Sequence, residues 1–358
     1  MKWLLLFCFI SLQLIQNYPS RSTDTNGTQL RHTIPHFFNL YSEPDFGSAV
    51  IGRLPPQSLI VMPVSTDGWS QVSTAIGTGY INIYISPNYD RMNNYLGRLG
   101  HNVAVFYKNL DTGLTFIHNP ERVLFAASLS KLTHAFYTYQ MAERGYIDIY
   151  QNFTFRAADQ WGGTGTLQFQ PHGTVLTMRE LLGLSIIESD NAAFRMLVRY
   201  TSANVNYTFH DFVREKGRVQ RFIRDIYAQN TSVVDMGNWM YLIWHYINEE
   251  SQFGHYFLHD LKNTAQTSHP HFTRWPGSFG VGGEVNVRMI ESDYEMARKY
   301  GWTTGAFHDA AIVFADSPYI LVIITNMDRG AHALFEDVSL FVQDFNRRTF
   351  AQVSGNNE

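Results

Sequence analysis

The chain has 358 residues, of which 45% are hydrophobic and 16% are charged, and its formal net charge at pH 7 is −4. This length is enough for two domains with cores of their own, and the composition excludes an intrinsically disordered chain. The slightly acidic balance excludes a global positive field, so we expect no nucleic-acid partner.

The first twenty residues are typical of a signal peptide, so we assign residues 1–20 to one. Lys2 precedes a mostly apolar run, 3–15, which is short for a membrane span. No small-x-small cleavage site follows, so an uncleaved anchor is the alternative. Cys8 is the only cysteine and lies inside this segment, so a mature chain would have no disulfide, cysteine-bound metal or cysteine nucleophile. We expect a secreted or extracellular protein that is associated with the cell envelope.

Residues 33–86 contain short β-type segments that are separated by turn residues. The segments are 37–41, 50–52, 58–61, 68–72 and 77–83. Five short strands in this stretch predict a small all-β barrel. The stretches NLYSEP, DGWSQV and GTGYINI stand where bacterial SH3-like domains have their signature stretches, so this part resembles that family. The resemblance implies a module that binds cell-wall peptides or glycans. A spacer, or a domain that only packs on the rest of the chain, is the alternative.

A larger domain is predicted at 96–352, after a linker at 87–91. Two pairs of strand-type segments, each pair flanking a turn, predict two hairpins. These segments are 103–107 with 114–117, and 309–314 with 319–324. A terminal amphipathic helix is predicted at about 331–350. Strands at both ends of the domain and helices between them indicate a mixed α/β fold of the α+β type, with one antiparallel sheet flanked by helices.

Three helices are predicted inside this domain. The first runs from Ser128 to about Arg144 and ends at Gly145, because its apolar residues recur at one-turn steps along one face. The second begins at Thr177, which with Glu180 three residues later forms a capping box. The third covers 191–200.

Ser128 and Lys131 are three residues apart at the start of the first helix, so we expect their β-carbons about 5–6 Å apart on one face. A serine hydroxyl needs a base within hydrogen-bond reach before it attacks a carbonyl. A lysine becomes that base when burial and nearby positive charge lower its pKa. The pair predicts a serine nucleophile with a lysine base, although this spacing also arises by chance. Ser130 faces another way and is expected to be structural.

Ser189-Asp190-Asn191 follow the apolar segment 181–187, which we expect to bury the base of their loop. The Ser189 hydroxyl could relay a proton to a leaving nitrogen, and the Asn191 amide could bind Lys131 or a substrate carbonyl. The alternative is a helix N-cap made by Ser189 or Asp190. The two roles are compatible, and Asp190 is assigned mainly to holding the loop.

Lys299-Tyr300-Gly301-Trp302 lie on a predicted edge strand just before the second hairpin. A lysine here could bind a substrate carboxylate, and Gly301 would let the substrate backbone approach closely. The N–H groups of Ser128 and Trp302 would then face the developing oxyanion. Taken alone, Lys299 is better explained as an exposed strand lysine.

Together the three motifs resemble the S-x-x-K, S-D-N and K-T-G motifs of the class A β-lactamase and penicillin-binding serine hydrolases. The likeness covers roughly 96–352 and includes the stretches FAASLSKL, GGTGTLQF, TMRELLGLSIIESDNAAFRML and HDAAIVF. It implies a role for each polar residue: nucleophile for Ser128, base for Lys131, proton shuttle for Ser189, substrate and lysine contact for Asn191, and carboxylate site for Lys299. By the same resemblance, Tyr300, Gly301 and Trp302 would bind substrate, and residues 163–167 would line the cleft.

The chain departs from the family pattern in two places. Tyr300 stands where the family usually has a threonine or serine, so a small hydroxyl for the substrate carboxylate is missing; its phenol either reaches the substrate or narrows the pocket. The stretch 218–232 should correspond to the loop whose glutamate activates the deacylating water, but Asp225 is its only carboxylate. Glu188 is expected on a helix flank. Efficient β-lactam hydrolysis is therefore not expected.

Other polar clusters give weaker signals. His255 and His259 are four residues apart and His269 and His271 are close, but no third ligand has a suitable spacing for zinc. We expect no metal and no cofactor. His308 opens a predicted strand, where a structural hydrogen bond is the default, and the glycines at 280–283 lack the strand-turn-helix setting of a nucleotide loop.

We therefore expect an exported serine hydrolase that is acylated at Ser128 by a β-lactam or a peptidoglycan peptide amide and deacylates weakly. The alternative is a non-catalytic protein of the same fold that binds the cell envelope, as Tyr300 and the missing loop glutamate suggest. Because every polar group needed for acylation is present, the enzyme is the preferred hypothesis. The oligomeric state and the natural substrate do not follow from the sequence.

Overall fold

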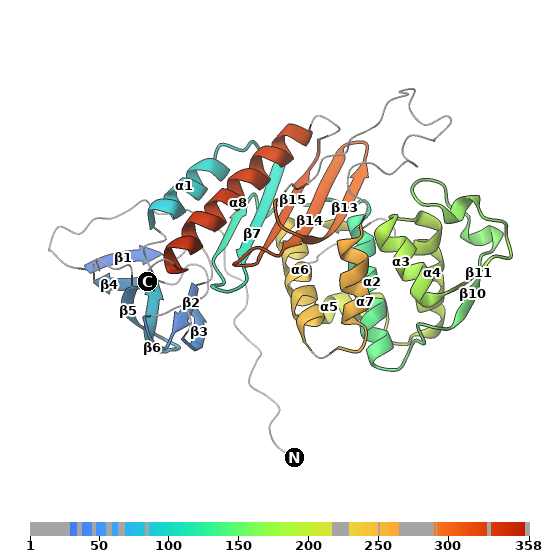
Figure 1. Cartoon of the computed structure of the whole chain (residues 1–358), viewed down its shortest axis with the longest axis horizontal. Coiled ribbons are helices and arrows are strands. Elements are labelled where there is room, and N and C mark those ends of the chain that lie inside the picture. Colours follow the sequence, from blue (N-terminus) through green and yellow to red (C-terminus); the bar gives the residue numbers. More distant parts are fainter. Residues whose placement is uncertain are drawn as a thin grey trace, which may run out of the picture.

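The computed structural model describes residues 29–33, 38–44, 48–54, 59–63, 69–82, 86–216, 229–249, 251–264, 290, 292–327 and 331–354. Figure 1 shows a small group of strands from the N-terminal part, a central sheet with two helices along one face, and a group of helices on the other face. The predicted signal peptide, the glycines at 280–283 and the pair His269 and His271 lie outside the described residues.

The central sheet is antiparallel and has five strands in the order β13-β14-β15-β7-β8. Their bounds are β7 Val103–Asn109, β8 Thr115–His118, β13 Met296–Thr303, β14 Ala306–Val313 and β15 Tyr319–Thr325. Both predicted hairpins are present, and β15 pairs with β7, so strands from the two ends of the domain complete one sheet. The predicted α+β class is confirmed. β13, which carries the third motif, is an edge strand, as expected.

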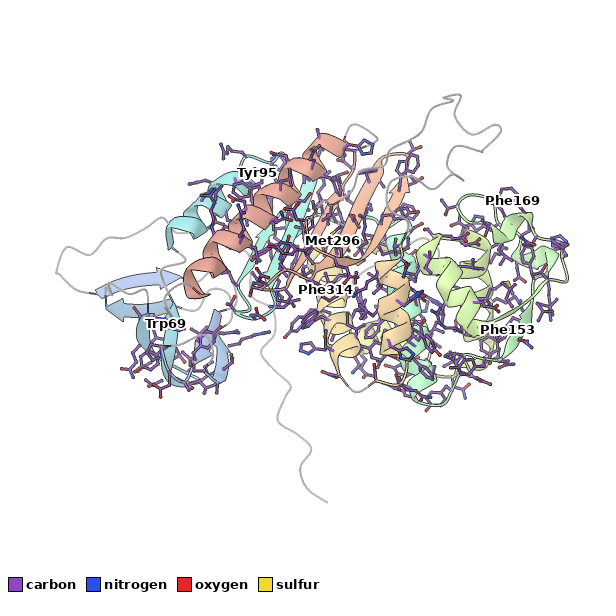
Figure 2. The ribbon with its side chains drawn as sticks, viewed as in Figure 1. Trp69, Tyr95, Phe153, Phe169, Met296 and Phe314 are labelled. Carbon is purple, nitrogen blue, oxygen red and sulfur yellow. The ribbon has the colours of Figure 1, made fainter. Side chains whose placement is uncertain are left out.

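Helices α1 (Ser86–Leu96) and α8 (His332–Ser354) cover one face of this sheet. Alternate residues of each strand face them, because side chains along a strand point to opposite faces; Val105 and Ile323 share a buried cluster with Phe335 of α8. Tyr95 of α1 (labelled in Figure 2) stacks on Phe341 of α8, with ring centroids 3.7 Å apart.

The linker predicted at 87–91 is wrong, because these residues lie inside helix α1. The sequence Pro87-Asn88 resembles a turn, but proline is tolerated in the first turn of a helix, where its missing N–H has no helical partner in any case. Met92 and Leu96 then bury one side of the helix in the core that α8 also covers.

The other face of the sheet carries the remaining helices, which are α2 Leu129–Glu143, α3 Met178–Ile187, α4 Asn191–Asn204, α5 Phe209–Lys216, α6 Val233–Asn248 and α7 Gly254–Lys262. Short elements connect them: β9 Leu124–Phe125, β10 Asn152–Thr154, β11 Val175–Thr177 and β12 Asn230–Thr231, with 3₁₀ turns at Ala157–Asp159 and Leu167–Phe169. The capping box of α3 is confirmed: the Glu180 N–H donates to Thr177 Oγ1 at 3.1 Å, and the Thr177 N–H donates to Glu180 Oε2 at 2.7 Å.

Helix α2 is more deeply buried than its pattern predicted. Its apolar stripe is buried as expected, but polar residues on the other sides, such as Thr133, His134 and Thr138, are buried too. The reason is that α2 lies between the sheet and helices α3, α4, α5 and α7, and a helix in the centre of a domain has no face left for water. This central position holds the start of α2 rigidly against the sheet.

The N-terminal part contains six strands, β1 Gln29–Thr33, β2 Phe38–Tyr41, β3 Val50–Leu54, β4 Leu59–Pro63, β5 Trp69–Thr74 and β6 Gly77–Asn82. Five of them match the predicted segments. They form a four-stranded sheet, β3-β2-β6-β5, and a separate pair, β1-β4. This part contacts the larger domain, where Arg53 donates to the Tyr241 hydroxyl at 3.2 Å. No helix in the described part of the chain is long and apolar enough to cross a membrane.

Candidate active site

Ser128 is the N-cap residue of α2, and Lys131 lies one turn further along the helix. The Lys131 amine donates a hydrogen bond to Ser128 Oγ at 3.2 Å. Ala127, just before the serine, has a positive φ of 47°, a conformation that costs about 1–3 kcal/mol for a residue with a side chain. The predicted pairing of this serine with this lysine is therefore present, on a backbone segment that its surroundings hold in place.

The Lys131 side chain is buried and points into the second motif. Its amine donates to Asn191 Oδ1 at 2.6 Å, to Ser189 Oγ at 3.2 Å and to the Ser189 carbonyl oxygen. Burial lowers the pKa of Lys131 to about 7, against a smaller opposing effect from the Asp190 carboxylate. A neutral amine is thus accessible near pH 7, next to a serine hydroxyl.

The second motif is a tight loop between α3 and α4. Ser189 has a positive φ of 55°, and Asp190 caps α4 by accepting the Ala193 N–H at 2.8 Å. The same carboxylate accepts the Leu167 N–H at 2.8 Å, so Asp190 holds two loops, as assigned from the sequence. Both alternatives for this motif hold together: it is a helix cap, and it also places Ser189 and Asn191 beside Lys131.

The loop at 162–167 packs against this motif. The Asn191 amide donates to the Gly162 carbonyl at 2.9 Å, and the Asn191 N–H donates to the Thr164 carbonyl at 3.0 Å. Glu188 follows the last residue of α3 and accepts hydrogen bonds from the N–H and the hydroxyl of Thr166, at 3.1 and 2.6 Å. Sequence reasoning missed this role of Glu188, because the contact joins two loops that are distant in sequence.

Gly301 brings the third motif against the start of α2. A β-carbon at this position would lie 2.8 Å from the Ala126 carbonyl oxygen and 3.2 Å from the Ser128 nitrogen. From the sequence, this glycine was expected to allow the close approach of a substrate backbone. In the structure the space is taken by the backbone of residues 126–129, so Gly301 sets the distance between β13 and Ser128. Trp302 is the next residue on the strand and is partly exposed.

Lys299 is fully buried, and its amine donates to the Tyr300 carbonyl at 3.1 Å. The alternative of an exposed strand lysine is therefore wrong. Burial lowers the pKa of Lys299 well below its usual value, and the nearby Lys131 lowers it further. The two lysines thus lie within electrostatic reach of each other, although they come from different motifs.

His308 links the sheet to the segment before Ser128. Its Nδ1 accepts the Thr325 N–H at 3.1 Å, so its Nε2 carries the proton and donates to the Phe125 carbonyl at 2.8 Å. Burial lowers the pKa of His308, which favours this neutral form. The structural role expected for His308 is confirmed.

A buried ion pair supports the edge strand. Arg298 of β13 and Asp309 of β14 lie 2.7 Å apart with side chains that are 3% and 0% exposed, and Asp309 also accepts the Ile290 N–H at 3.1 Å. We predict that Arg298→Met lowers the free energy of unfolding by about 3–5 kcal/mol, because it leaves a buried carboxylate without its cation. Urea unfolding followed by circular dichroism measures this. The double variant with Asp309→Leu should recover most of the loss; equal stability of the wild type and the single variant would contradict the prediction.

Two sequence-based expectations concern the deacylating loop and a metal site. The stretch 218–232 was expected to correspond to the deacylating loop. Most of it falls within residues 217–228, which lie outside the described residues. Gln229, which follows them, is buried, and its carbonyl accepts the Ala126 N–H at 2.8 Å. Within the described ranges, no group of three or more His, Cys, Asp or Glu side chains could hold a metal ion.

Comparisons with known proteins agree with this fold. A sequence comparison matches residues 88–345 to the Beta-lactamase2 family, described as the beta-lactamase enzyme family. Because this stretch is more than half of the chain, the protein belongs to that family. The fold class and the family match thus place the chain among the β-lactamase-like serine hydrolases, as the resemblance implied. The match begins after the N-terminal strands, so the SH3-like resemblance stays a prediction.

Several solved structures share the fold. One is described as the structure of PBP-A; it is 18% identical, has a TM-score of 0.60, and the alignment covers 74% of this chain and 97% of that chain. A β-lactamase from Sphaerobacter thermophilus is 18% identical, with a TM-score of 0.55 and coverage of 75% and 98%. A β-lactamase from Chitinophaga pinensis is 17% identical, with a TM-score of 0.58 and coverage of 72% and 99%. At such identities the likeness shows the fold alone. No curated protein matches the chain.

Proposed function

We propose that the protein is an acyl-transfer enzyme in which Ser128 attacks the carbonyl of a β-lactam or of a cell-wall peptide amide. The observation that carries this proposal is the 3.2 Å contact between Lys131 Nζ and Ser128 Oγ, made by a buried amine whose pKa is lowered to about 7. A base of this kind activates a serine hydroxyl at neutral pH.

The acylation step moves one proton through three groups. Neutral Lys131 accepts the Ser128 proton while Oγ forms a bond to the carbonyl carbon, and the resulting ammonium is stabilised by Asn191 Oδ1 at 2.6 Å. The carbon–nitrogen bond then breaks, and the proton passes through the Ser189 hydroxyl, 3.2 Å from the amine, to the leaving nitrogen. Lys131 is neutral again at the end of the step. The N–H groups of Ser128 and Trp302 are proposed to hold the oxyanion.

We propose that the acyl-enzyme is hydrolysed slowly. The sequence 218–232 contains no glutamate, so the residue that activates the deacylating water in class A β-lactamases has no counterpart there. One solved neighbour is described as an acyl-enzyme complex of a PBP-A mutant with penicillin G. The likeness is one of fold alone. The covalent acyl-enzyme is the form of this protein that an experiment should look for.

Export and attachment to the cell envelope belong to the same proposal. They rest on the apolar run at 3–15 and on the N-terminal strands that resemble SH3-like modules. Fractionation of cells that express the full chain, followed by binding to purified peptidoglycan, measures both.

The direct test of the enzyme is an adduct on Ser128. The protein is incubated with excess benzylpenicillin and, in parallel, with p-nitrophenyl acetate, and its intact mass is measured over time. We expect the mass of the acyl group to be added to the wild type by at least one reagent, and not to Ser128→Ala. Absence of any adduct with both reagents would contradict the proposal, and fast turnover of nitrocefin would contradict slow deacylation.

A non-catalytic envelope-binding protein is the second candidate. The observation that favours it is the complete burial of Lys299, which withdraws from solvent the cation expected to meet the substrate. Peptidoglycan binding that persists in Ser128→Ala, together with a wild type that no ester or β-lactam acylates, would favour this second function.

A further inference from the structure

The Tyr300 ring covers the amine of Lys299. The Lys299 Nζ lies 4.2 Å from the centroid of this ring, and the lysine is 0% exposed while the tyrosine is 5% exposed. The Lys299 amine also donates a hydrogen bond to the Tyr300 carbonyl oxygen at 3.1 Å. An amine held in this way under an aromatic ring is not accessible to a charged ligand. The cation that the sequence assigned to substrate recognition is thus closed off by its own neighbour.

The covering ring belongs to β13, the outermost strand of the sheet. Neighbouring side chains on a strand point to opposite faces, and Tyr300 belongs to the cluster on the α8 face. Lys299 and Tyr300 can therefore meet only where both bend around the free side of the strand, and β13 is an edge strand. Burial is the main cause of both pKa shifts, and charges on other elements add to it: Lys131 lowers the pKa of Lys299 further, and Glu188 contributes to the raised pKa of Tyr300.

No cation of β13, a strand that the structure describes in full, remains available for a carboxylate. Arg298 is paired with Asp309 at 2.7 Å, and its side chain is 3% exposed. Burial lowers the pKa of Lys299 well below its usual value, which disfavours the charged form of this amine. A carboxylate that leaves water for this cleft would gain no compensating charge from the strand, and an unpaired buried anion is strongly unfavourable.

The hydroxyl of Tyr300 offers a different kind of contact. It is buried and has no hydrogen-bond partner among the described residues. Burial raises the pKa of Tyr300 to about 12, so the hydroxyl stays neutral and keeps its proton. A neutral O–H donor suits a neutral acceptor, such as an amide or ester carbonyl.

We propose that Tyr300 is a specificity-determining residue, whose ring closes off Lys299 so that the site selects acyl donors without a carboxylate beside the reacting carbonyl. The inference rests on the proposed acylation of Ser128 and narrows its substrate class. The preferred donors are neutral amides or esters, with the phenol as a hydrogen-bond donor to them.

The test compares benzylpenicillin with its methyl ester, which differ only in the carboxylate. Rates of Ser128 acylation are measured by intact mass for the wild type, Tyr300→Thr and Tyr300→Phe, with Ser128→Ala as the blank and thermal unfolding as the check of folding. We expect the wild type to react with the ester at least about tenfold faster than with the acid, a factor that corresponds to losing one charged contact. Tyr300→Thr should raise the rate with the acid about tenfold or more, so that the ratio of the two rates shifts at least about tenfold towards the acid.

Tyr300→Phe is the matched control, because it keeps the ring and removes only the hydroxyl. It should retain the preference for the ester and react several-fold more slowly with it. A wild type that prefers the acid by tenfold overturns the inference, and this result does not depend on any variant folding. A second case is a wild type that p-nitrophenyl acetate labels but neither penicillin does. If Tyr300→Thr is then still not labelled by benzylpenicillin, the inference is overturned, whereas the proposed nucleophile is not. If p-nitrophenyl acetate also leaves Ser128 unlabelled, the proposed function itself is contradicted, and the inference with it.

Discussion

Replacing Lys131 with methionine should lower the rate of Ser128 acylation by about a thousandfold, within the range typical for loss of a general base. The amine is the group that lies 3.2 Å from Ser128 Oγ, and methionine fills similar space without a proton acceptor. The rate of adduct formation with an activated ester, followed by mass spectrometry, measures the loss. Lys131→Arg is the control for charge and length, because a guanidinium cannot give up its proton in a protein; it should be equally inactive. An arginine variant that keeps the wild-type rate would show that the residue does not act as a base.

The pH dependence of the wild type provides a second readout of the same base. The pKa of Lys131 is lowered to about 7 by burial, and only the neutral amine accepts the serine proton. The acylation rate should therefore be low below pH 6, rise about tenfold between pH 6 and pH 8, and level off above. A profile that is flat over this range, or one that falls with rising pH, would exclude Lys131 as the base.

Substituting alanine for Gly301 should lower acylation by about a hundredfold, while the protein stays folded. The added β-carbon would lie 2.8 Å from the Ala126 carbonyl oxygen and 3.2 Å from the Ser128 nitrogen. These are backbone atoms at the start of the buried helix α2, so they cannot turn aside and β13 must move away. A displacement of about 1 Å in a catalytic site costs about two orders of magnitude in rate.

Gly100→Ala is the matched control for that substitution. A β-carbon at Gly100 meets no atom within 4 Å. Gly100 precedes β7, and β14 and β15 lie between β7 and β13 in the sheet. We expect the control to acylate at the wild-type rate and to melt at nearly the wild-type temperature. If Gly301→Ala also reacts at the wild-type rate, the close approach of β13 to Ser128 does not affect acylation.

Lys299 and Glu188 show why some site residues could be predicted from the sequence and others could not. Lys299 was found because its spacing from the first two motifs is typical of a family, and the structure places it near Lys131. Its burial was not predicted, since it depends on the helices that pack against β13 and on the Tyr300 ring, which lies 4.2 Å from the amine. Likewise, the contact of Glu188 with Thr166 joins loops from separate elements, and no local pattern marks it.

The N-terminal strands and helix α1 show the same difference between what local patterns predict and what tertiary packing decides. Alternating apolar residues and turn signals located five of its strands, because both are properties of neighbouring residues. The segment at 87–91 was assigned to a linker because proline and asparagine favour turns, whereas Met92 and Leu96 are buried on the core under α8. That core includes residues of α8 more than two hundred positions away, so tertiary packing overrode a local preference.

The amino-acid sequence alone determined the fold class, the positions of most strands and helices, and the three groups of residues that belong together. It could do so because strand alternation, helix capping and motif spacing act over a few residues. Only the tertiary structure decided the distance from Lys131 to Ser128, the use of Gly301 as a spacer against the nucleophile, and the enclosure of Lys299 by Tyr300. Each of these depends on which elements meet in space, and the electrostatic cost of burial, which sets the charge of both lysines, exists only after they have met.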